Sequence, residues 1–167
     1  MSPVEMYTTI YKKTTLVKAM KLYSHLCEVV LFAAMCFVLY KAYLASVGLL
    51  ISVAVLSLFS LVVVSVARRL IRAPRPCEVY AELEFLKDDH GSFSFPSRHA
   101  FSAFLISTLA LHFVPILGGA LLFLSLLLCA ARVLLGRHFL RDVVAGAVIG
   151  AISGALVLLF SYNIFAV

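Results

Sequence analysis

Charged side chains are scarce in this sequence. Aspartate, glutamate, lysine and arginine make up only 13% of its 167 residues, whereas 63% of the residues are hydrophobic. Near-continuous apolar runs of this kind are typical of an integral membrane protein and exclude an ordinary water-soluble domain. The length fits a single membrane-embedded domain over residues 1–167, with no room for an added soluble domain.

The sequence also lacks the cysteine patterns of metal sites and disulfide frameworks. No two of its four cysteines form a Cys-x-x-Cys pair, and three of them lie inside apolar segments. A zinc site or a disulfide framework is therefore not expected. The first 22 residues contain no apolar core, which argues against a cleavable signal peptide.

The net charge of +6 does not indicate a nucleic-acid-binding protein. The cations lie at the ends of apolar segments and do not form a surface stripe with interleaved aromatic residues. Anionic lipid headgroups or a phosphorylated substrate are the better partners.

Five apolar segments predict membrane-spanning helices, because each approaches the ~20 residues that cross a hydrocarbon core. They cover residues 26–44, 47–67, 100–114, 116–135 and 143–165. Residues 1–24 are expected to form an interfacial helix, whose lipid side could carry Met6, Tyr7, Ile10, Leu16 and Met20. The predicted fold is all-α: an integral membrane helical bundle of about five transmembrane helices plus this N-terminal helix.

Three short polar islands interrupt the apolar sequence between residues 68 and 142. They are Arg68-x6-Arg75-Pro76, then Pro96-Ser97-Arg98-His99, then Arg132-x5-His138-x3-Asp142. Counting the predicted crossings places all three islands on one side of the membrane. Ionisable residues are costly in lipid, so their convergence indicates a functional site.

His138 and Asp142 are four residues apart, which places them on one face if a helix begins there. A carboxylate beside an imidazole fixes its tautomer, as a nucleophilic or basic histidine requires. The pair alone fits an unrelated interfacial histidine equally well. Three glycines follow Asp142 at intervals of four, so the carboxylate is expected to face the bundle: Gly146, Gly150 and Gly154.

The other two islands contain groups that bind phosphate. Ser97 is predicted to cap a helix, and a helix N-terminus with His99 close by suits an anion. Guanidinium groups bind phosphate oxygens in a bidentate fork. Four arginines lie on the same side as the histidines: Arg68, Arg75, Arg98 and Arg132.

The order and spacing of these islands resemble the three signature motifs of the type 2 phosphatidic acid phosphatase family. Those motifs are Lys-x6-Arg-Pro, Pro-Ser-Gly-His and Ser-Arg-x5-His-x3-Asp. Three positions depart from them: Arg68 replaces the lysine, Arg98 the glycine and Ala131 the serine. These three departures keep both histidines and the aspartate. They change side chains that would surround the headgroup of a substrate.

The resemblance implies a metal-independent lipid phosphate phosphatase that uses no cofactor. His138 would attack phosphorus to form a phosphohistidine, Asp142 would orient it, and His99 would protonate the leaving oxygen and then activate water. The phosphoryl oxygens would be held by Arg68, Arg75, Ser97, Arg98 and Arg132. The resemblance also offers the substrates phosphatidic acid, phosphatidylglycerol phosphate and undecaprenyl diphosphate, and it points to the bacterial inner membrane.

The sequence does not decide which side of the membrane the predicted site faces. Four N-terminal lysines lie on the side of the islands and favour a cytoplasmic site. The resemblance implies an outward-facing site. The number of subunits is not determined by the sequence.

Other classes of function fit less well. A catalytically inactive lipid-phosphate-binding protein of the same fold is the main alternative, although the retained histidines argue against it. The spans argue against a soluble haloperoxidase, and a transporter would show an inverted repeat. Three histidines lie outside the motifs and are expected at the interface or in loops: His25, His90 and His112. Glu28, near the start of the first span, is expected to extend to the interface, and a position lining the cavity is the alternative.

Overall fold

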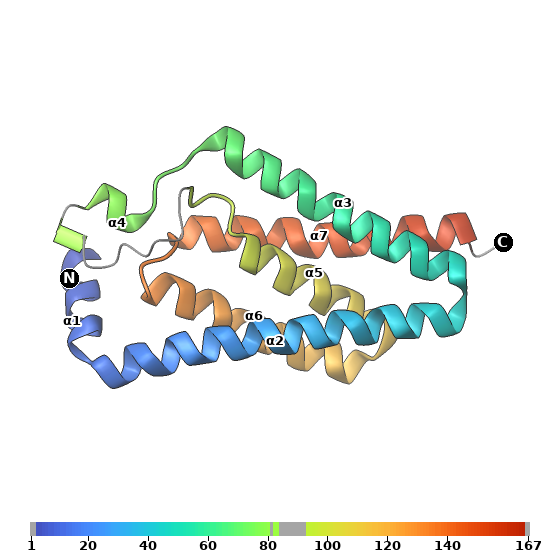
Figure 1. Ribbon diagram of the computed structural model, residues 1–167, viewed down its shortest axis with the longest axis horizontal. Helices are drawn as coiled ribbons and strands as arrows, with labels where there is room; N and C mark the ends of the chain where they lie inside the picture. The colour runs from blue at the N-terminus through green and yellow to red at the C-terminus, as the bar shows by residue number, and fades with distance from the viewer. Residues whose placement is uncertain (1–2, 81, 84–92, 166–167) are drawn as a thin grey trace.

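The computed structural model describes residues 3–80, 82–83 and 93–165, and these residues contain helices and no strands. Long helices run side by side to form an elongated bundle, and the short helix α1 lies across one of its ends (Figure 1). The predicted all-α bundle is therefore confirmed. The helices are α1 Pro3–Lys12, α2 Thr14–Ala45, α3 Val47–Ile71, α4 Pro76–Val79, α5 Arg98–Phe113, α6 Pro115–Leu134 and α7 Leu140–Phe165.

Within the described residues, α2, α3, α6 and α7 are long and apolar enough to cross a membrane. Their outward faces carry exposed apolar side chains such as Phe32, Leu58 and Ile152, as expected of surfaces that meet lipid. Helix α5 corresponds to the third predicted span. Its 16 residues reach about 24 Å, less than the ~30 Å hydrocarbon core. It lies inside the bundle, packed chiefly against α6 and α7.

The close contact between α5 and α7 follows from the glycine face of α7. A Cβ atom on Gly150 would lie 2.2 Å from the carbonyl oxygen of Phe101, and one on Gly146 would lie 2.4 Å from that of Ser97. Only glycine allows the two backbones to approach so closely. The same face carries Asp142, whose side chain is fully buried in the bundle, as the four-residue spacing predicts.

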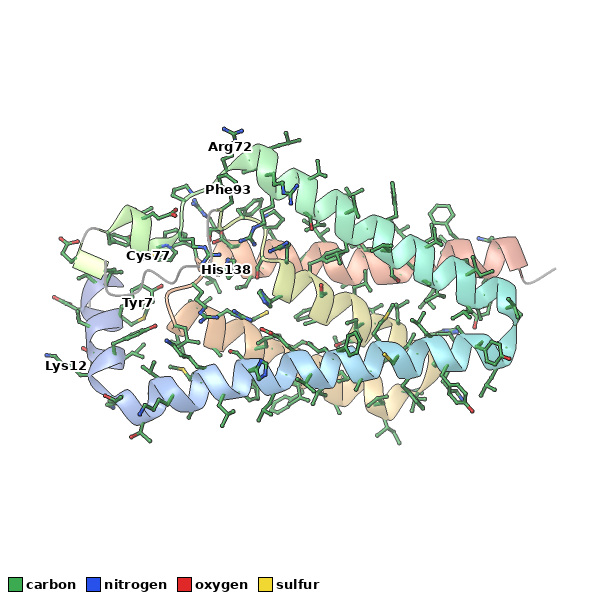
Figure 2. The ribbon with its side chains drawn as sticks, viewed as in Figure 1. Tyr7, Lys12, Arg72, Cys77, Phe93 and His138 are labelled. Atoms are coloured by element: carbon green, nitrogen blue, oxygen red, sulfur yellow. The ribbon has the colours of Figure 1, made fainter. Side chains whose placement is uncertain are left out.

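The N-terminal region differs from the single interfacial helix expected over residues 1–24. Helix α1 ends at Lys12, and α2 begins at Thr14 and continues without a break into the first span. Tyr7 does not face lipid: it is buried with Cys77 and Leu83 in a small core of its own. Figure 2 shows Tyr7 and Cys77 at the same end of the bundle as His138. An amphipathic pattern cannot distinguish an apolar face that meets lipid from one that meets protein.

Candidate active site

The three polar islands meet at one end of the bundle, around a cavity of about 620 Å³. Six of the eight residues singled out from the sequence line this cavity: Arg68, Arg75, Arg98, His99, Arg132 and His138. The other two, Ser97 and Asp142, are buried completely and do not line it. The remaining lining residues are Lys21, Ser24, His25 and Glu28 from α2, and Arg137. We call this space the phosphate cavity.

His138 lies in the turn between α6 and α7, where a buried hydroxyl links it to Asp142. The Oγ of Ser94 lies 3.3 Å from His138 Nδ1 and donates a hydrogen bond to Asp142 Oδ2. The direct distance between His138 Nδ1 and Asp142 Oδ2 is 3.8 Å, which is too long for a hydrogen bond. The backbone N–H of Phe139 donates to the same carboxylate oxygen over 2.8 Å. With its Nδ1 side held in this way, the ring leaves Nε2 as its other reactive atom.

The protonation of His138 suits a nucleophile. Burial lowers the pKa of His138 below its ordinary value, and the neighbouring Asp142 opposes that effect only in part. The imidazole is therefore neutral at neutral pH and keeps a lone pair.

His99 lies in the first turn of α5, next to the carboxylate of Glu28 from α2. Glu28 Oε1 lies 3.3 Å from His99 Nε2 and also pairs with the Nη2 of Arg132. Glu28 lines the phosphate cavity, which is the alternative to the interfacial position that the sequence favours. Arg132 is buried within an apolar helix and stabilises the carboxylate there.

Some side-chain nitrogen atoms of the residues around the phosphate cavity make no hydrogen bond within the described part of the chain. Among the described residues, the buried Nε atoms of Arg75 and Arg132 have no hydrogen-bond partner, and neither does the buried Nδ1 of His99. Buried polar groups are normally paired. Arg75 and Arg132 also line the phosphate cavity, where guanidinium groups fit the oxygens of a phosphate.

Backbone hydrogen bonds fix the islands against one another. The N–H of Ser97 donates to the carbonyl of Asp142 over 3.0 Å, and the Nη1 of Arg68 donates to the carbonyl of Pro96 over 3.3 Å. Ser97 is the N-cap of α5, as predicted, and its Oγ accepts from the N–H of Ala100. The phosphate cavity thus opens at the N-terminus of a helix, where the helix dipole favours an anion.

The remaining histidines have different surroundings. His25 is exposed and lines the phosphate cavity from α2. His112 lies outside the cavity, 2.8 Å from the hydroxyl of Tyr162. His90 is outside the described residues.

Sequence reasoning missed one polar residue of the site, Ser94, and favoured the interface over the cavity for another, Glu28. Ser94 is three residues from Ser97 in the same polar island, and that nearness was the available signal. Glu28 gave a weaker signal: a carboxylate one turn inside an apolar helix needs a partner.

No group of three or more histidine, cysteine, aspartate or glutamate side chains suited to a metal ion occurs in the part of the chain that the structure describes. The phosphate cavity contains a single carboxylate, that of Glu28, among its described lining residues. Its chemistry is that of an anion site built from guanidinium groups, imidazoles and backbone N–H groups.

An all-helical membrane bundle with an arginine-lined, two-histidine cavity at one end defines a class of protein: a membrane-embedded phosphatase. The chain belongs to the PAP2 superfamily, which matches residues 45–166, well over half of its length.

Two solved structures share this fold. One is the first transmembrane PAP2-type phosphatidylglycerolphosphate phosphatase from Bacillus subtilis, with a TM-score of 0.71 and 21% identity over 97% of this chain and 85% of that one. The other is LpxE from Aquifex aeolicus, with a TM-score of 0.62 and 23% identity over 92% of this chain and 93% of that one. No curated protein sequence matches the chain.

Proposed function

We propose that the chain hydrolyses a phosphomonoester or diphosphate of a membrane lipid through a phosphohistidine intermediate. The observation that carries this proposal is that the phosphate cavity meets an apolar groove. Three residues line both spaces: Glu28, Arg98 and His99.

The groove extends from these residues along α2, α3 and α5. Its first part, about 360 Å³, is lined by Leu31, Phe32, Met35 and Leu61 among others. A second hollow of about 370 Å³ shares Phe32, Met35 and Leu61 and extends to Leu39. We call this combined space the tail groove. An apolar space leading into a cationic cavity fits an amphiphile with a phosphate at its polar end.

The proposed reaction has two steps. In the first, Nε2 of His138 attacks phosphorus, the bond between phosphorus and the lipid oxygen breaks, and His99 gives its proton to the departing oxygen. In the second, His99 takes a proton from water, the hydroxide attacks phosphorus, and the bond between phosphorus and nitrogen breaks. Asp142 stabilises the positive charge that forms on His138 during the attack.

The phosphoryl oxygens bear the charge that the transition state redistributes, so positioned cations supply most of the stabilisation. We assign this role to the guanidinium groups and backbone of five residues: Arg68, Arg75, Ser97, Arg98 and Arg132. Ser97 contributes through its place at the α5 N-terminus, since its side chain is fully buried.

Three lipid classes fit a cationic cavity joined to an apolar groove: phosphatidylglycerol phosphate, phosphatidic acid and undecaprenyl diphosphate. The two structural relatives, from Bacillus subtilis and Aquifex aeolicus, support a bacterial cell membrane as the location.

The test is phosphate release from a panel of these lipids by the purified chain in detergent. We expect release from at least one lipid by the wild type and none from His138→Ala, since the nucleophile is lost. Chelator in the assay is expected to leave the rate unchanged, because no step needs a metal. Full activity in His138→Ala would exclude the mechanism, and phosphate-lipid binding without release by the wild type would favour an inactive binding protein.

A further inference from the structure

Three polar residues that the signature motifs do not specify line the phosphate cavity: Lys21 and His25 on α2, and Arg137 in the turn before α7. The proposed function assigns them no role. Lys21, His25 and Glu28 follow one another at intervals of four and three residues, so they share one face of α2. Since all three line the cavity, that face is turned toward the cavity and not toward lipid.

The positive charge around the cavity exceeds what one phosphate group neutralises. The described lining residues include six lysine and arginine side chains and one carboxylate, that of Glu28. Glu28 pairs with Arg132, so it does not neutralise Lys21. A phosphomonoester carries only about −1.5 to −2 charge at neutral pH. The remaining positive charge favours a second anion in the same cavity.

The cations are divided between opposite sides of the cavity. Helices α2 and α3 meet in the turn at Ser46 and diverge toward the end of the bundle that holds the cavity (Figure 1). Lys21 lies on α2, whereas Arg68 lies near the end of α3 and Arg75 at the N-cap of α4. The cavity volume of about 620 Å³ lies in the range of pockets for drug-sized ligands. Space therefore remains beside a phosphate held by Arg68 and Arg75.

We propose that Lys21, His25 and Arg137 form a second phosphate-binding subsite, next to the place of the phosphoryl group under attack. An ammonium group, an imidazole N–H and a guanidinium group all donate hydrogen bonds to phosphate oxygens. Arg137 directly precedes His138, so the subsite adjoins the proposed nucleophile. Lys21 and His25 are exposed, so a ligand reaches the subsite from water.

The ligand of this subsite is a phosphate group, and the proposed function, on which the inference rests, supplies two sources of it. One is the second phosphate in the headgroup of phosphatidylglycerol phosphate or undecaprenyl diphosphate, which phosphatidic acid lacks. The other is the inorganic phosphate that leaves His138 in the second step. The tail groove follows α2 from Glu28 toward Leu39, whereas Lys21 and His25 precede Glu28. The subsite thus lies away from the tail groove, where released phosphate departs to water.

The experiment compares Lys21→Gln with the matched control Lys18→Gln. Each variant removes one positive charge from an exposed position on α2, but Lys18 does not line the cavity. The substrates are phosphatidic acid, with one phosphate, and the two lipids with two phosphates. Inorganic phosphate is added as an inhibitor. We expect Lys18→Gln to keep every KM and the Ki of phosphate within about threefold of wild type.

The two sources of phosphate predict changes in different constants. If the subsite holds a second headgroup phosphate, Lys21→Gln raises the KM of the two-phosphate lipids about tenfold relative to that of phosphatidic acid. If it holds released phosphate, Lys21→Gln raises the Ki of inorganic phosphate about tenfold and keeps the ratio of the KM values. Arg137→Gln should change the same constant. Either result supports the subsite and identifies its ligand.

Equal effects of Lys21→Gln and Lys18→Gln on these constants would overturn the inference, because α2 would then contribute only general positive charge. If the wild type releases phosphate from no lipid, the proposed function fails, and calorimetric titration of the purified protein with inorganic phosphate tests the subsite. Binding about tenfold tighter to wild type and Lys18→Gln than to Lys21→Gln would support it. Equal affinities would overturn it.

Discussion

At the scale of single residues, the imidazole of His138 depends on a hydroxyl. The carboxylate of Asp142 lies 3.8 Å from Nδ1, and the Oγ of Ser94 contacts both groups. A ring held through a bridging hydroxyl keeps its orientation only while that hydroxyl is present. Ser94 is thus a structural requirement for the geometry of the proposed nucleophile.

We predict that Ser94→Ala lowers kcat by about 10- to 100-fold and leaves KM nearly unchanged, because the ring loses its link to Asp142. Steady-state phosphate release measures both constants. Ser107→Ala is the matched control: Ser107 is also a fully buried serine, but it bonds the carbonyl of Ala103, away from the phosphate cavity. Equal losses in the two variants would show that burial, not the bridge, matters.

The buried position of His138 predicts its titration. Because burial lowers its pKa, NMR of ¹³C-labelled histidine should place its midpoint below the ordinary value of about 6.5. The folded state then binds this proton less readily than the unfolded state, so this group lowers stability as pH falls below about 6.5. A midpoint at or above that value would contradict the burial of the ring.

The residues of the motifs could be predicted because their spacing is local and repeats a known pattern. The sequence could not decide between the interface and the cavity for Glu28, since its partner Arg132 lies 104 residues away and nothing near Glu28 indicates the pairing. Ser94 needs the fold as well, because it meets Asp142 across 48 residues. The buried position of Tyr7 does not follow from the sequence, since its partners Cys77 and Leu83 come together only in the tertiary structure.

At the scale of elements, the bundle depends on the spacing of α5 and α7. The sequence predicts the glycine face of α7 and the short length of the third apolar segment. It does not predict the break between α1 and α2 at Lys13, because neither glycine nor proline marks that break.

We predict that Gly150→Ala lowers the free energy of unfolding by about 1–3 kcal/mol or more, since the new methyl group meets the backbone of Phe101. Gly119→Ala is the matched control in α6, where a Cβ meets nothing within 4 Å; helix propensity there favours alanine by up to about 1 kcal/mol. Thermal unfolding in detergent compares the two. Equal unfolding temperatures would show that α7 can move away from α5 without cost.

At the scale of the whole molecule, the distribution of charge predicts orientation. Lys12, Lys13, Lys18 and Lys21 lie toward the end of the bundle that holds the phosphate cavity, whereas the opposite turn has only Lys41 nearby. Cytoplasmic ends of membrane helices are enriched in lysine and arginine. We therefore expect the cavity to face the cytoplasm.

Labelling of single cysteines in intact cells checks this orientation. Cys77 itself is buried, so engineered exposed positions are needed. Val47→Cys, in the turn opposite the cavity, should react with an impermeant maleimide added outside. Lys12→Cys should react only after the cells are permeabilised. The reverse pattern would place the cavity on the outer face.

The hydrogen bond from the Ser97 N–H to the Asp142 carbonyl, together with the glycine contacts, joins α5 and α7 into one stiff unit. His99 belongs to α5, and His138 lies just before the start of α7. Bending of either helix by the surrounding bilayer carries both imidazoles along together. The tail groove is lined by α5 as well as by α2 and α3, so a lipid tail bound there would push on this unit as a whole, and we expect the two imidazoles to keep their separation.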